Sequence, residues 1–394
     1  MRILVHDYCG HAFQVELSRW LAAEGHEVLH LYSREIDSPR GALAPHPNDS
    51  PSLTIEGLAL GRRVAKYAPL RRLHHESAYT RLAARRLRTF RPDAVLSGNC
   101  TAVVQRGLLR AARRSGAPFL YWLQDIYSDG VERTLAQRFG VPGRLAARLH
   151  RRLEFRTLAV SDAVVAITPD FAPILTTGGV APERVHVIEN WAVAAPAHAD
   201  GAAWRAEHDL GERFVLLYAG TLGLKHDPEV LLALARHCRD TPHMAVVVVS
   251  QGLGRDYLET ARQREGLANL ILLDFQPVER VAEMHAAADI LLAVLEPYAG
   301  VLSVPSKVLG YLRSGRPILA AIPADNLAAR TISAAGAGLV VAPDELAAAA
   351  DRLYRDPGLR TRFGRAGAAY ALVHFDVAAK GRAFLDAIAA ARRA

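Results

Sequence analysis

Cysteine is scarce in this chain and follows no pattern. The three cysteines, Cys9, Cys100 and Cys238, are widely spaced, and no C-x-x-C pair occurs. An odd number of isolated cysteines argues against a disulfide framework and against a zinc site built from thiolates. We therefore expect a protein that works in a reducing cytoplasm.

Long hydrophobic runs are also missing. No apolar run approaches the roughly 18 residues of a membrane-spanning helix, and residues 1–6 enter a strand-like segment without the apolar region of a signal peptide. Hydrophobic residues nevertheless make up 51% of the 394 residues. We expect a soluble or peripheral protein with two cores, because one core of this size would be unusual.

Acidic residues are rare in two segments of the first half. Arg62–Arg91 holds ten Lys or Arg and one acid, Glu76, and five arginines within 144–156 have only Glu154 to oppose them. Basic faces attract anionic lipid, nucleic acid or acidic substrates. Nucleic acid is disfavoured, because no motif for it is present and few aromatic residues interleave the charges. Two interpretations remain: an anionic membrane surface bound through Arg62–Arg91, on the inner face of the plasma membrane, or a solvated helix face.

Strand-like and helix-like segments alternate along both halves. Strand 3–5, a turn with Gly10, and a helix with apolar residues at helical spacing open the chain, and 214–218 restarts the rhythm. This predicts an α/β protein with two Rossmann-like domains, whose parallel sheets bind ligands at the carboxyl ends of their strands. No G-x-G-x-x-G follows the first strand, which disfavours NAD. Residues 37–60, with several Pro, Asn and Ser, are expected to form a long surface loop.

The most informative stretch is 296–317, which lies between two short apolar runs. We expect a loop that turns into a helix, with Pro305 in the first helical turn. The start of a helix presents unpaired N–H groups, to which Ser303, Ser306 and Lys307 add two hydroxyl groups and a charge. This combination favours a phosphate or diphosphate ligand. The alternative is that Ser306 only caps the helix and Lys307 faces solvent.

Two other predicted strands also run into polar residues. Strand 214–218 leads into a glycine loop with Gly220 and Lys225, which can cradle phosphate although it is not a Walker A sequence. Strand 118–123 leads into Asp125, at a position where a carboxylate suits chemistry better than packing. The alternative for Asp125 is a cap of the next helix.

The pattern Pro305-Ser306-Lys307, an apolar helix and then Gly315-Arg316-Pro317-Ile318 resembles the donor-binding segment of glycosyltransferase family 4, the retaining enzymes of GT-B fold. The Ser-Val-Pro-Ser-Lys form is similar to a branch that acts in bacterial polysaccharide and lipid-linked sugar assembly. The resemblance implies two Rossmann-like domains facing a central cleft, a nucleotide-diphosphate sugar as co-substrate, no metal, and retention of the anomeric configuration.

The sequence departs from this family at two positions. Many members carry two glutamates separated by seven residues, and here Leu302 and Gly310 stand in their places. One of those glutamates holds the donor ribose and the other faces the donor sugar. Both roles are unassigned in this chain, with Glu296 or Ser303 as the candidates to replace them.

The resemblance also implies roles for individual residues. It implies catalytic roles for Asp125, which follows Gln124 instead of the usual His, and for Lys225 and Lys307 at the diphosphate. Thr221 stands where the family often has Arg, and Lys225 is displaced by one position. The predicted donor-binding residues are Gly10, Asn190, Gly220, Thr221, Ser250, Gln251, Gln276, Pro277, Ser303, Ser306 and Lys307.

We expect an acceptor-binding domain over 1–190, a linker over 191–205 and a nucleotide-sugar-binding domain over 206–375. The final segment, 376–394, is expected to be a helix that packs back on the first domain, as in GT-B enzymes. The acceptor is a glycan, a lipid-linked sugar or a small molecule. Two other functions stay open: a nucleotide-sugar epimerase, and a non-catalytic nucleotide-sugar-binding partner of another enzyme.

Overall fold

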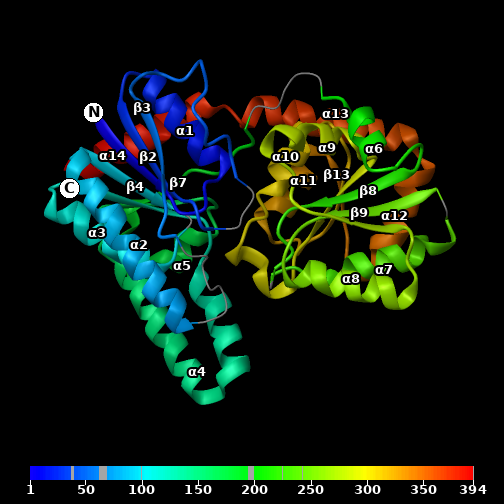
Figure 1. The fold of residues 1–394 in the computed structure, drawn as a ribbon, viewed down its shortest axis with the longest axis horizontal. Coiled ribbons are helices and arrows are strands. Elements are labelled where there is room, and N and C mark those ends of the chain that lie inside the picture. Colours follow the sequence, from blue (N-terminus) through cyan, green and yellow to red (C-terminus); the bar gives the residue numbers. More distant parts are fainter. Residues whose placement is uncertain are drawn as a thin grey trace. The chain divides into compact units, whose positions relative to one another are not determined.

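The computed structural model describes residues 1–36, 40–61, 69–98, 100–193, 199–223, 225–241 and 243–393. The chain forms two units, each with helices packed on both faces of a sheet (Figure 1). Unit 1 comprises Met1–Glu189 and Val377–Ala394, and unit 2 comprises Asn190–Asp376. Every strand pair in both sheets is parallel, which confirms the predicted α/β class.

Unit 1 contains a seven-stranded sheet in the order β3-β2-β1-β4-β5-β6-β7. Strands β4, β5 and β6 are buried along their whole length, because helices cover both faces of a parallel sheet. The strand order reverses between β1 and β4, which is where open parallel sheets bind ligands. The strands are β1 Arg2–Asp7, β2 Glu27–Ser33, β3 Leu53–Leu58, β4 Ala94–Gly98, β5 Phe119–Leu123, β6 Ala163–Ala166 and β7 Val185–Val187.

The helices of unit 1 form two layers. Helices α1 and α14 pack together, α2 packs on α3, and α3 packs on α4 (Figure 1). Helix α4 is two helical segments joined at Gly140, where φ is 58° and ψ is −129°. The helices are α1 Ala12–Ala23, α2 Pro69–Phe90, α3 Ala102–Arg114, α4 Tyr127–Ala159, α5 Phe171–Thr177, η1 Pro182–Arg184 and α14 Val377–Arg393.

The C-terminal helix α14 completes the core of unit 1. The ring of Phe384 lies 4.5 Å, centroid to centroid, from that of Trp122 on β5, and both side chains are buried. Gly381 lies so close to Trp20 of α1 that a Cβ there would come within 2.1 Å of the indole. The chain therefore returns from unit 2 to unit 1 at its end.

Unit 2 contains a six-stranded sheet in the order β10-β9-β8-β11-β12-β13, with the reversal between β8 and β11. Helices α7, α8 and α12 cover one face, and α9, α10, α11 and α13 lie on the other (Figure 1). The strands are β8 Phe214–Ala219, β9 Met244–Val249, β10 Leu270–Leu273, β11 Ile290–Val294, β12 Ile318–Ala321 and β13 Gly338–Val340. The helices are α6 Gly201–Glu207, α7 Pro228–His237, η2 Cys238–Asp240, α8 Leu253–Glu265, η3 Val278–Arg280, α9 Val281–Ala287, η4 Pro297–Leu302, α10 Lys307–Arg313, α11 Leu327–Ala335, η5 Pro343–Glu345, α12 Leu346–Arg355 and α13 Pro357–His374.

The surface loop predicted for 37–60 is partly wrong, because it contains β3. This strand pairs in parallel with β2, from Leu53 opposite Val28 to Leu58 opposite Ser33. As an edge strand it is only partly buried, and it contains a glutamate and a glycine, which weakens the strand signal in the sequence. Residues 37–39 of this stretch lie outside the described residues.

The predicted linker 191–205 overlaps an ordered helix. Helix α6 begins at Gly201, Trp204 is fully buried, and Arg205 pairs with Asp289 at 2.7 Å. The small residues before α6 resemble a linker in composition, but the tryptophan anchors the helix to unit 2. Residues 194–198 lie outside the described residues.

All three cysteines are free thiols. Over the described ranges, each helix is either too short or too polar to cross a bilayer.

Candidate active site

Two loops meet where the strand order of the second sheet reverses. One follows β8 and carries Lys225, and the other follows β11 and carries Ser303. The Lys225 ammonium donates a hydrogen bond to the Ser303 hydroxyl at 3.1 Å, and the N–H of Glu296 donates to the Lys225 carbonyl at 2.8 Å. The fold therefore joins the two loops that the sequence analysis singled out, at the edge where parallel sheets bind ligands.

Lys307 points into the same region with its charge unsatisfied. Its ammonium nitrogen is buried and has no hydrogen-bond acceptor among the described residues, although the side chain as a whole is partly exposed. It lies 3.4 Å from the centroid of the Tyr218 ring, a cation–π contact. Burial lowers the pKa of Lys307 well below its ordinary value. A buried ammonium without an acceptor is suited to receive an anion.

Gly220 makes room for this lysine. Its φ is +129°, which side-chain-bearing residues rarely adopt, and a Cβ at this position would lie 3.1 Å from Lys307 Cε. Its N–H donates to the carbonyl of Val249 at 3.0 Å, so β9 fixes the start of the loop. A glycine is needed here both for the backbone conformation and for the approach of Lys307.

His226 lies near both lysines. Its ring meets that of Tyr218 edge-on, with centroids 6.4 Å apart, and its Nδ1 is buried without a hydrogen-bond partner in the described part of the chain. Burial, with added effects from the charges of Lys307 and Lys225, lowers the pKa of His226 to about 3. The imidazole is therefore neutral at physiological pH, and Nδ1 is available to a ligand.

Asn326 holds the β11 loop in place. Its amide nitrogen donates to the carbonyl of Ser303 at 2.7 Å and to the carbonyl of Gly300, and its amide oxygen accepts from the N–H of Ala328 at 2.8 Å. The side chain is fully buried. One residue thus caps α11 and fixes the backbone of Ser303, which in turn receives the hydrogen bond from Lys225.

The predicted donor-binding residues after β9 and β10 continue along the same edge. Ser250 follows β9, its N–H donates to the carbonyl of Leu273 at 3.0 Å, and its hydroxyl is buried without a partner among the described residues. Gln276 follows β10 and donates to the carbonyl of Asp274 at 3.0 Å. Gln251 and Pro277 are exposed. Since β10, β9, β8 and β11 are consecutive in the sheet, these positions form one row.

The expected helix-start anion site needs a correction. Helix α10 begins at Lys307, two residues after Pro305, and it has only seven residues, so its dipole is small. Ser306 is exposed, and its side chain makes no capping hydrogen bond. Thr221 is also exposed, and its carbonyl accepts a hydrogen bond from the Tyr218 hydroxyl at 2.9 Å. The positive charge of the site therefore comes from lysine side chains.

The two positions where the family carries glutamates are Leu302, in η4, and Gly310, in α10. A Cβ at position 310 would lie 3.4 Å from Cε1 of His285, whose buried ring packs edge-on against Tyr311 with centroids 5.1 Å apart. A neutral imidazole thus lies beside the place where a carboxylate would stand, because burial lowers the pKa of His285 to about 4.

In unit 1 the predicted residues follow the ends of strands β1 and β5. Gly10, with φ of +78°, lies in the turn after β1, and Asp125 lies directly after β5 and is partly exposed. The buried carboxylate of Asp7 shapes the first turn by accepting the N–H groups of Cys9, at 3.1 Å, and of His11. Asn190, at the start of unit 2, is buried.

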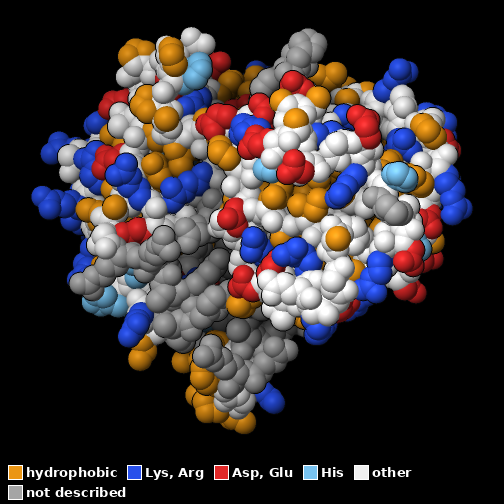
Figure 2. Space-filling model, turned by 45° about the vertical axis from the view of Figure 1, so that its right-hand side comes forward, with side chains coloured by type: hydrophobic (Ala, Val, Ile, Leu, Met, Phe, Trp, Pro, Cys, Tyr) orange, Lys and Arg blue, Asp and Glu red, His pale blue; other side chains and the backbone are white. Residues whose placement is uncertain are grey.

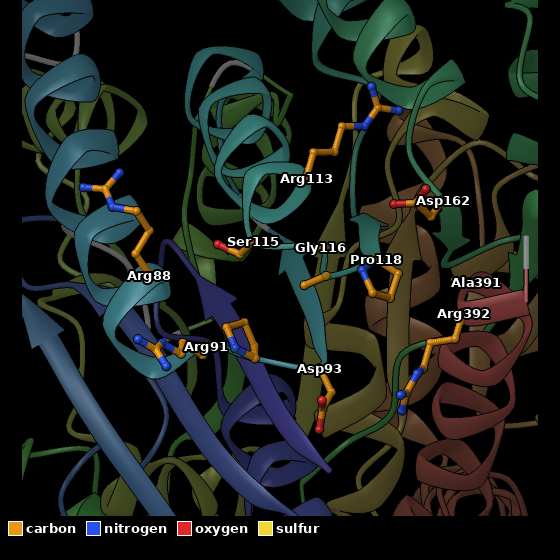
Figure 3. Close-up of a pocket in the computed structure, with 12 residues that line it drawn as sticks. Arg88, Arg91, Asp93, Arg113, Ser115, Gly116, Pro118, Asp162, Ala391 and Arg392 are labelled. Atoms are coloured by element: carbon orange, nitrogen blue, oxygen red, sulfur yellow. The ribbon is translucent and has the colours of Figure 1, made fainter.

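A hollow of about 910 Å³ lies at the opposite edge of the first sheet (Figure 3). Asp93 and Asp162 line it just before β4 and β6, and each accepts a backbone N–H at 2.8 Å. In Figure 3 the guanidinium groups around the hollow point in different directions. No predicted site residue lines it; its arginines are Arg88, Arg91, Arg113 and Arg392.

Three residues of the second-sheet site carry no role predicted from the sequence: His226, Tyr218 and Asn326. The sequence gives little indication of these roles, because each residue acts through partners that are distant in sequence. Asn326, for example, forms hydrogen bonds with residues 23 and 26 positions away.

Comparisons with known proteins match each of the two units of the chain to a family. A family described as "Glycosyl transferase 4-like domain" matches residues 11–191, and one described as "Glycosyl transferases group 1" matches residues 200–370. The chain is also 28% identical over 316 residues to WcaI of Escherichia coli strain K12, which is named as a colanic acid biosynthesis glycosyl transferase. That alignment covers 76% of each protein.

Solved structures share the fold at low identity. HepE of Anabaena, in complex with UDP and glucose, has a TM-score of 0.70 at 17% identity, with 98% of each chain covered. WaaG, a glycosyltransferase involved in lipopolysaccharide biosynthesis, has a TM-score of 0.69 at 18% identity, covering 98% of this chain and 99% of the other. Sucrose-phosphate synthase of Thermosynechococcus elongatus has a TM-score of 0.70 at 16% identity, with 98% of each covered.

Two units with parallel sheets, together with the two family matches, show a glycosyltransferase of GT-B fold. The two family matches span most of the chain, and the chain belongs to glycosyltransferase family 4. The resemblance seen in the Pro305–Ile318 segment is thereby confirmed.

Proposed function

We propose that this glycosyltransferase moves a sugar from a nucleotide-diphosphate sugar to an acceptor hydroxyl, with retention of the anomeric configuration and without a bound metal. The observation that carries the proposal is the buried, unsatisfied ammonium of Lys307 near the Lys225–Ser303 pair. Two cations at the reversal of a parallel sheet fit a diphosphate. The UDP complexes of HepE support this class of donor.

The chemical role of the site is to stabilise the leaving group. When the bond between the sugar and the diphosphate breaks, negative charge grows on the diphosphate oxygens. Lys225 and Lys307 supply fixed positive charge, and the hydroxyl groups of Ser303 and Ser250 supply short polar contacts. Removing one such preorganised group typically costs about 2.7–4 kcal/mol, or roughly 10²–10³ in turnover. The two lysines thus do the work that a metal ion does in other transferases.

Unit 1 is proposed to bind the acceptor. Gly10 and Asp125 follow strands β1 and β5, at the carboxyl edge of the first sheet, where ligands of parallel sheets bind. We assign to Asp125 the orientation of the acceptor hydroxyl or of the donor sugar. The names of WcaI and WaaG support a role in polysaccharide or lipopolysaccharide biosynthesis. We propose a glycan or lipid-linked acceptor and a location in the cytoplasm.

An anionic membrane surface is part of the proposal through the basic run Arg62–Arg91. Residues 62–68 lie outside the described residues. Within α2, Arg72 and Arg86 already pair with carboxylates at 2.8 and 2.5 Å, so the run offers less free charge than its composition suggests. The exposed arginines that remain within α2, Arg71, Arg81, Arg85 and Arg88, carry this part of the proposal.

The experiment is a panel of nucleotide-diphosphate sugars incubated with lipid-linked and soluble glycan acceptors. We expect acceptor-dependent release of the nucleotide diphosphate, unchanged by EDTA, and a product whose anomeric configuration, read by NMR, equals that of the donor. Inversion, or loss of activity with EDTA, would reject those parts of the proposal. Asp125→Asn should retain donor binding and lose transfer.

A second candidate is a non-catalytic nucleotide-sugar-binding protein, which the replacement of both family glutamates by Leu302 and Gly310 favours. Such a protein would bind a nucleotide sugar and release no nucleotide with any acceptor. The same panel separates the two functions.

A further inference from the structure

The second segment of α4, residues 141–159, exposes apolar side chains in a row. Val141, Leu145 and Leu149 follow at intervals of four residues and so lie along one line of the helix. Their exposed fractions are 74%, 61% and 59%. Phe139, just before the turn at Gly140, is 47% exposed. We call Val141, Leu145 and Leu149 the apolar stripe.

A line of arginines runs beside this stripe. Arg144, Arg148, Arg152 and Arg156 are also four residues apart, and all four are exposed. Each member of the apolar stripe has an arginine three residues further on, which places the two lines next to each other on the helix. We call these four residues the arginine stripe. In the described part of the chain, no carboxylate forms an ion pair with any of them.

Glu154, which the sequence places within this basic run, lies inside the protein. Its side chain is fully buried, and its carboxylate accepts the N–H of Ser128 at 3.0 Å, near the start of α4. The carboxylate of Glu154 is therefore absent from the exposed face of the segment. It faces the protein, and the exposed face of the segment carries only positive charge and apolar groups.

The surroundings extend the exposed apolar surface. The charges of Glu76 and Arg72 act on His150, whose pKa burial lowers, so the start of α2 lies beside this part of α4. There Leu70 is 83% exposed and Leu73 is 48% exposed. Figure 2 shows hydrophobic side chains gathered at the lowest part of the view, where α4 turns between its two segments in Figure 1, with a basic side chain close by.

We propose that the apolar and arginine stripes of α4 dock unit 1 onto the surface of an anionic lipid bilayer. Contact of five leucine and valine side chains with water is unfavourable, and monomeric proteins rarely leave such a group of apolar side chains exposed without a partner. A helix with apolar residues and arginines on its outer face lies in the headgroup region, where the apolar groups leave water and the guanidinium groups meet phosphates. A protein groove would satisfy the stripe but not four unpaired arginines.

The inference goes beyond the proposed transfer reaction and beyond the basic run of α2. It assigns lipid binding to α4 through insertion and charge together, whereas the α2 run acts by charge alone. Its test does not depend on the donor site, because vesicle binding is measured without nucleotide.

The test is flotation of the purified full chain with vesicles of phosphatidylglycerol and phosphatidylethanolamine, against vesicles of phosphatidylcholine. We expect binding to the anionic vesicles only. Leu145→Ser/Leu149→Ser and Arg148→Glu/Arg152→Glu should each reduce binding at least tenfold. The matched control is Arg110→Glu/Arg114→Glu on α3, which makes the same charge change at two exposed positions four residues apart and should bind like the parent.

Two readouts separate the components of binding. Raising the salt concentration should weaken binding of the parent, because ions screen the arginines, and should leave a residual binding that Leu145→Ser/Leu149→Ser lacks. A tryptophan introduced by Val141→Trp should show additional fluorescence that is quenched by brominated lipids. Circular dichroism and UDP or GDP affinity, unchanged in all variants, exclude misfolding and keep this result separate from failure of the donor site.

Three results would overturn the inference. One is equal or absent binding to the two kinds of vesicle, and another is parent-like binding by both stripe variants. The third is a self-associated parent that the leucine substitutions convert to monomer, without vesicle binding, which would assign the stripe to a second copy of the chain.

Discussion

The environment of Lys307 is unfavourable to the protein without a ligand. Its ammonium is buried, lacks an acceptor among the described residues, and is stabilised only by the face of Tyr218. A buried cation that is not paired costs free energy of folding. A bound anion would pair with the ammonium of Lys307, which explains why the protein keeps a lysine that is unfavourable in the free site.

We predict that Lys307→Met makes the unliganded protein more stable and nearly inactive. The substitution removes a buried amine that has no acceptor among the described residues and keeps a similar volume, so the free energy of unfolding should rise by about 1 kcal/mol, while turnover falls by roughly 10²–10³. Thermal unfolding and initial rates measure the two effects. Lys307→Arg is the control, because it keeps the charge and should keep the lower stability. A less stable Lys307→Met, or one with parental turnover, contradicts this account.

Binding of a nucleotide diphosphate should take up protons. In the free protein the pKa of Lys307 lies well below its ordinary value, and a diphosphate beside it should raise that pKa. Between the two pKa values the free site is mostly neutral and the bound site is charged, so affinity should fall as pH rises through this window. Calorimetry in buffers of different ionisation enthalpy measures the uptake. Lys307→Met should abolish it; uptake that persists in this variant would assign it to another group.

The sequence alone could predict only some of the residues of the candidate site. Lys225, Ser303 and Lys307 could be chosen because a lysine or serine after a predicted strand in a parallel sheet has a general meaning. His226 and Tyr218 could not, because their roles depend on rings that meet across a loop, which no local spacing encodes.

Among the elements, the loop after β11 depends on a single side chain from the next helix. This loop includes η4, Pro297–Leu302, in which Gly300 leaves helical geometry at φ 7° and ψ −115°. Asn326, at the start of α11, binds the carbonyls of Gly300 and Ser303. The position of Ser303, and with it the partner of Lys225, is therefore set by α11.

We predict that Asn326→Ala weakens donor binding and lowers stability together. It removes two buried donors and a helix cap, for which about 2–4 kcal/mol is expected. Asn326→Asp is the matched variant: it keeps the cap oxygen and loses the two N–H groups, so it should retain part of the stability and lose the loop anchor. Chemical denaturation and nucleotide titration measure both. An Asn326→Ala variant with parental donor affinity would show that the loop does not need this anchor.

The elements themselves were largely predictable where periodicity is strong. The buried strands β5, β9 and β11 are continuous apolar runs, and α14, Val377–Arg393, lies within the predicted final segment 376–394. The strand β3 and the helix α6 were not predicted, because a partly buried edge strand and an alanine-rich turn of helix have the composition of loops. Tertiary contacts, such as the burial of Trp204, decide their structure.

For the whole molecule, both units bury neutral histidines. Burial lowers the pKa of His6 and His30 in unit 1 to about 3, that of His226 in unit 2 to about 3, and that of His285 to about 4. An unfolded histidine takes up a proton near pH 6.5. Because the folded state binds fewer protons, the stabilisation is fully present above pH 6.5 and is lost as pH falls towards the folded pKa values.

Both units should therefore lose stability in the same acid range. At pH 5 each of these histidines should reduce the free energy of unfolding by about 2 kcal/mol relative to pH 7. Calorimetric scans between pH 7 and pH 4.5 measure the decrease. Melting temperatures that are flat over this range would contradict the burial of these rings in a neutral form.

The fold class and the family followed from the sequence because alternating apolar runs and one long motif are global signals. The proposed docking of α4 on a lipid surface did not, because the exposure of its apolar and arginine stripes is seen only in the structure. Whether the start of α10 forms an anion site also could not be predicted from the sequence, because it depends on the residue at which α10 begins.

We propose that the loops after β8 and β11 bind the donor diphosphate. Crystals soaked with UDP and, separately, GDP would locate its two phosphorus atoms. We expect diphosphate density within hydrogen-bonding distance of the ammonium groups of Lys225 and Lys307. Diphosphate bound in the arginine-lined hollow at the amino edge of the first sheet, or anywhere away from both lysines, would contradict it.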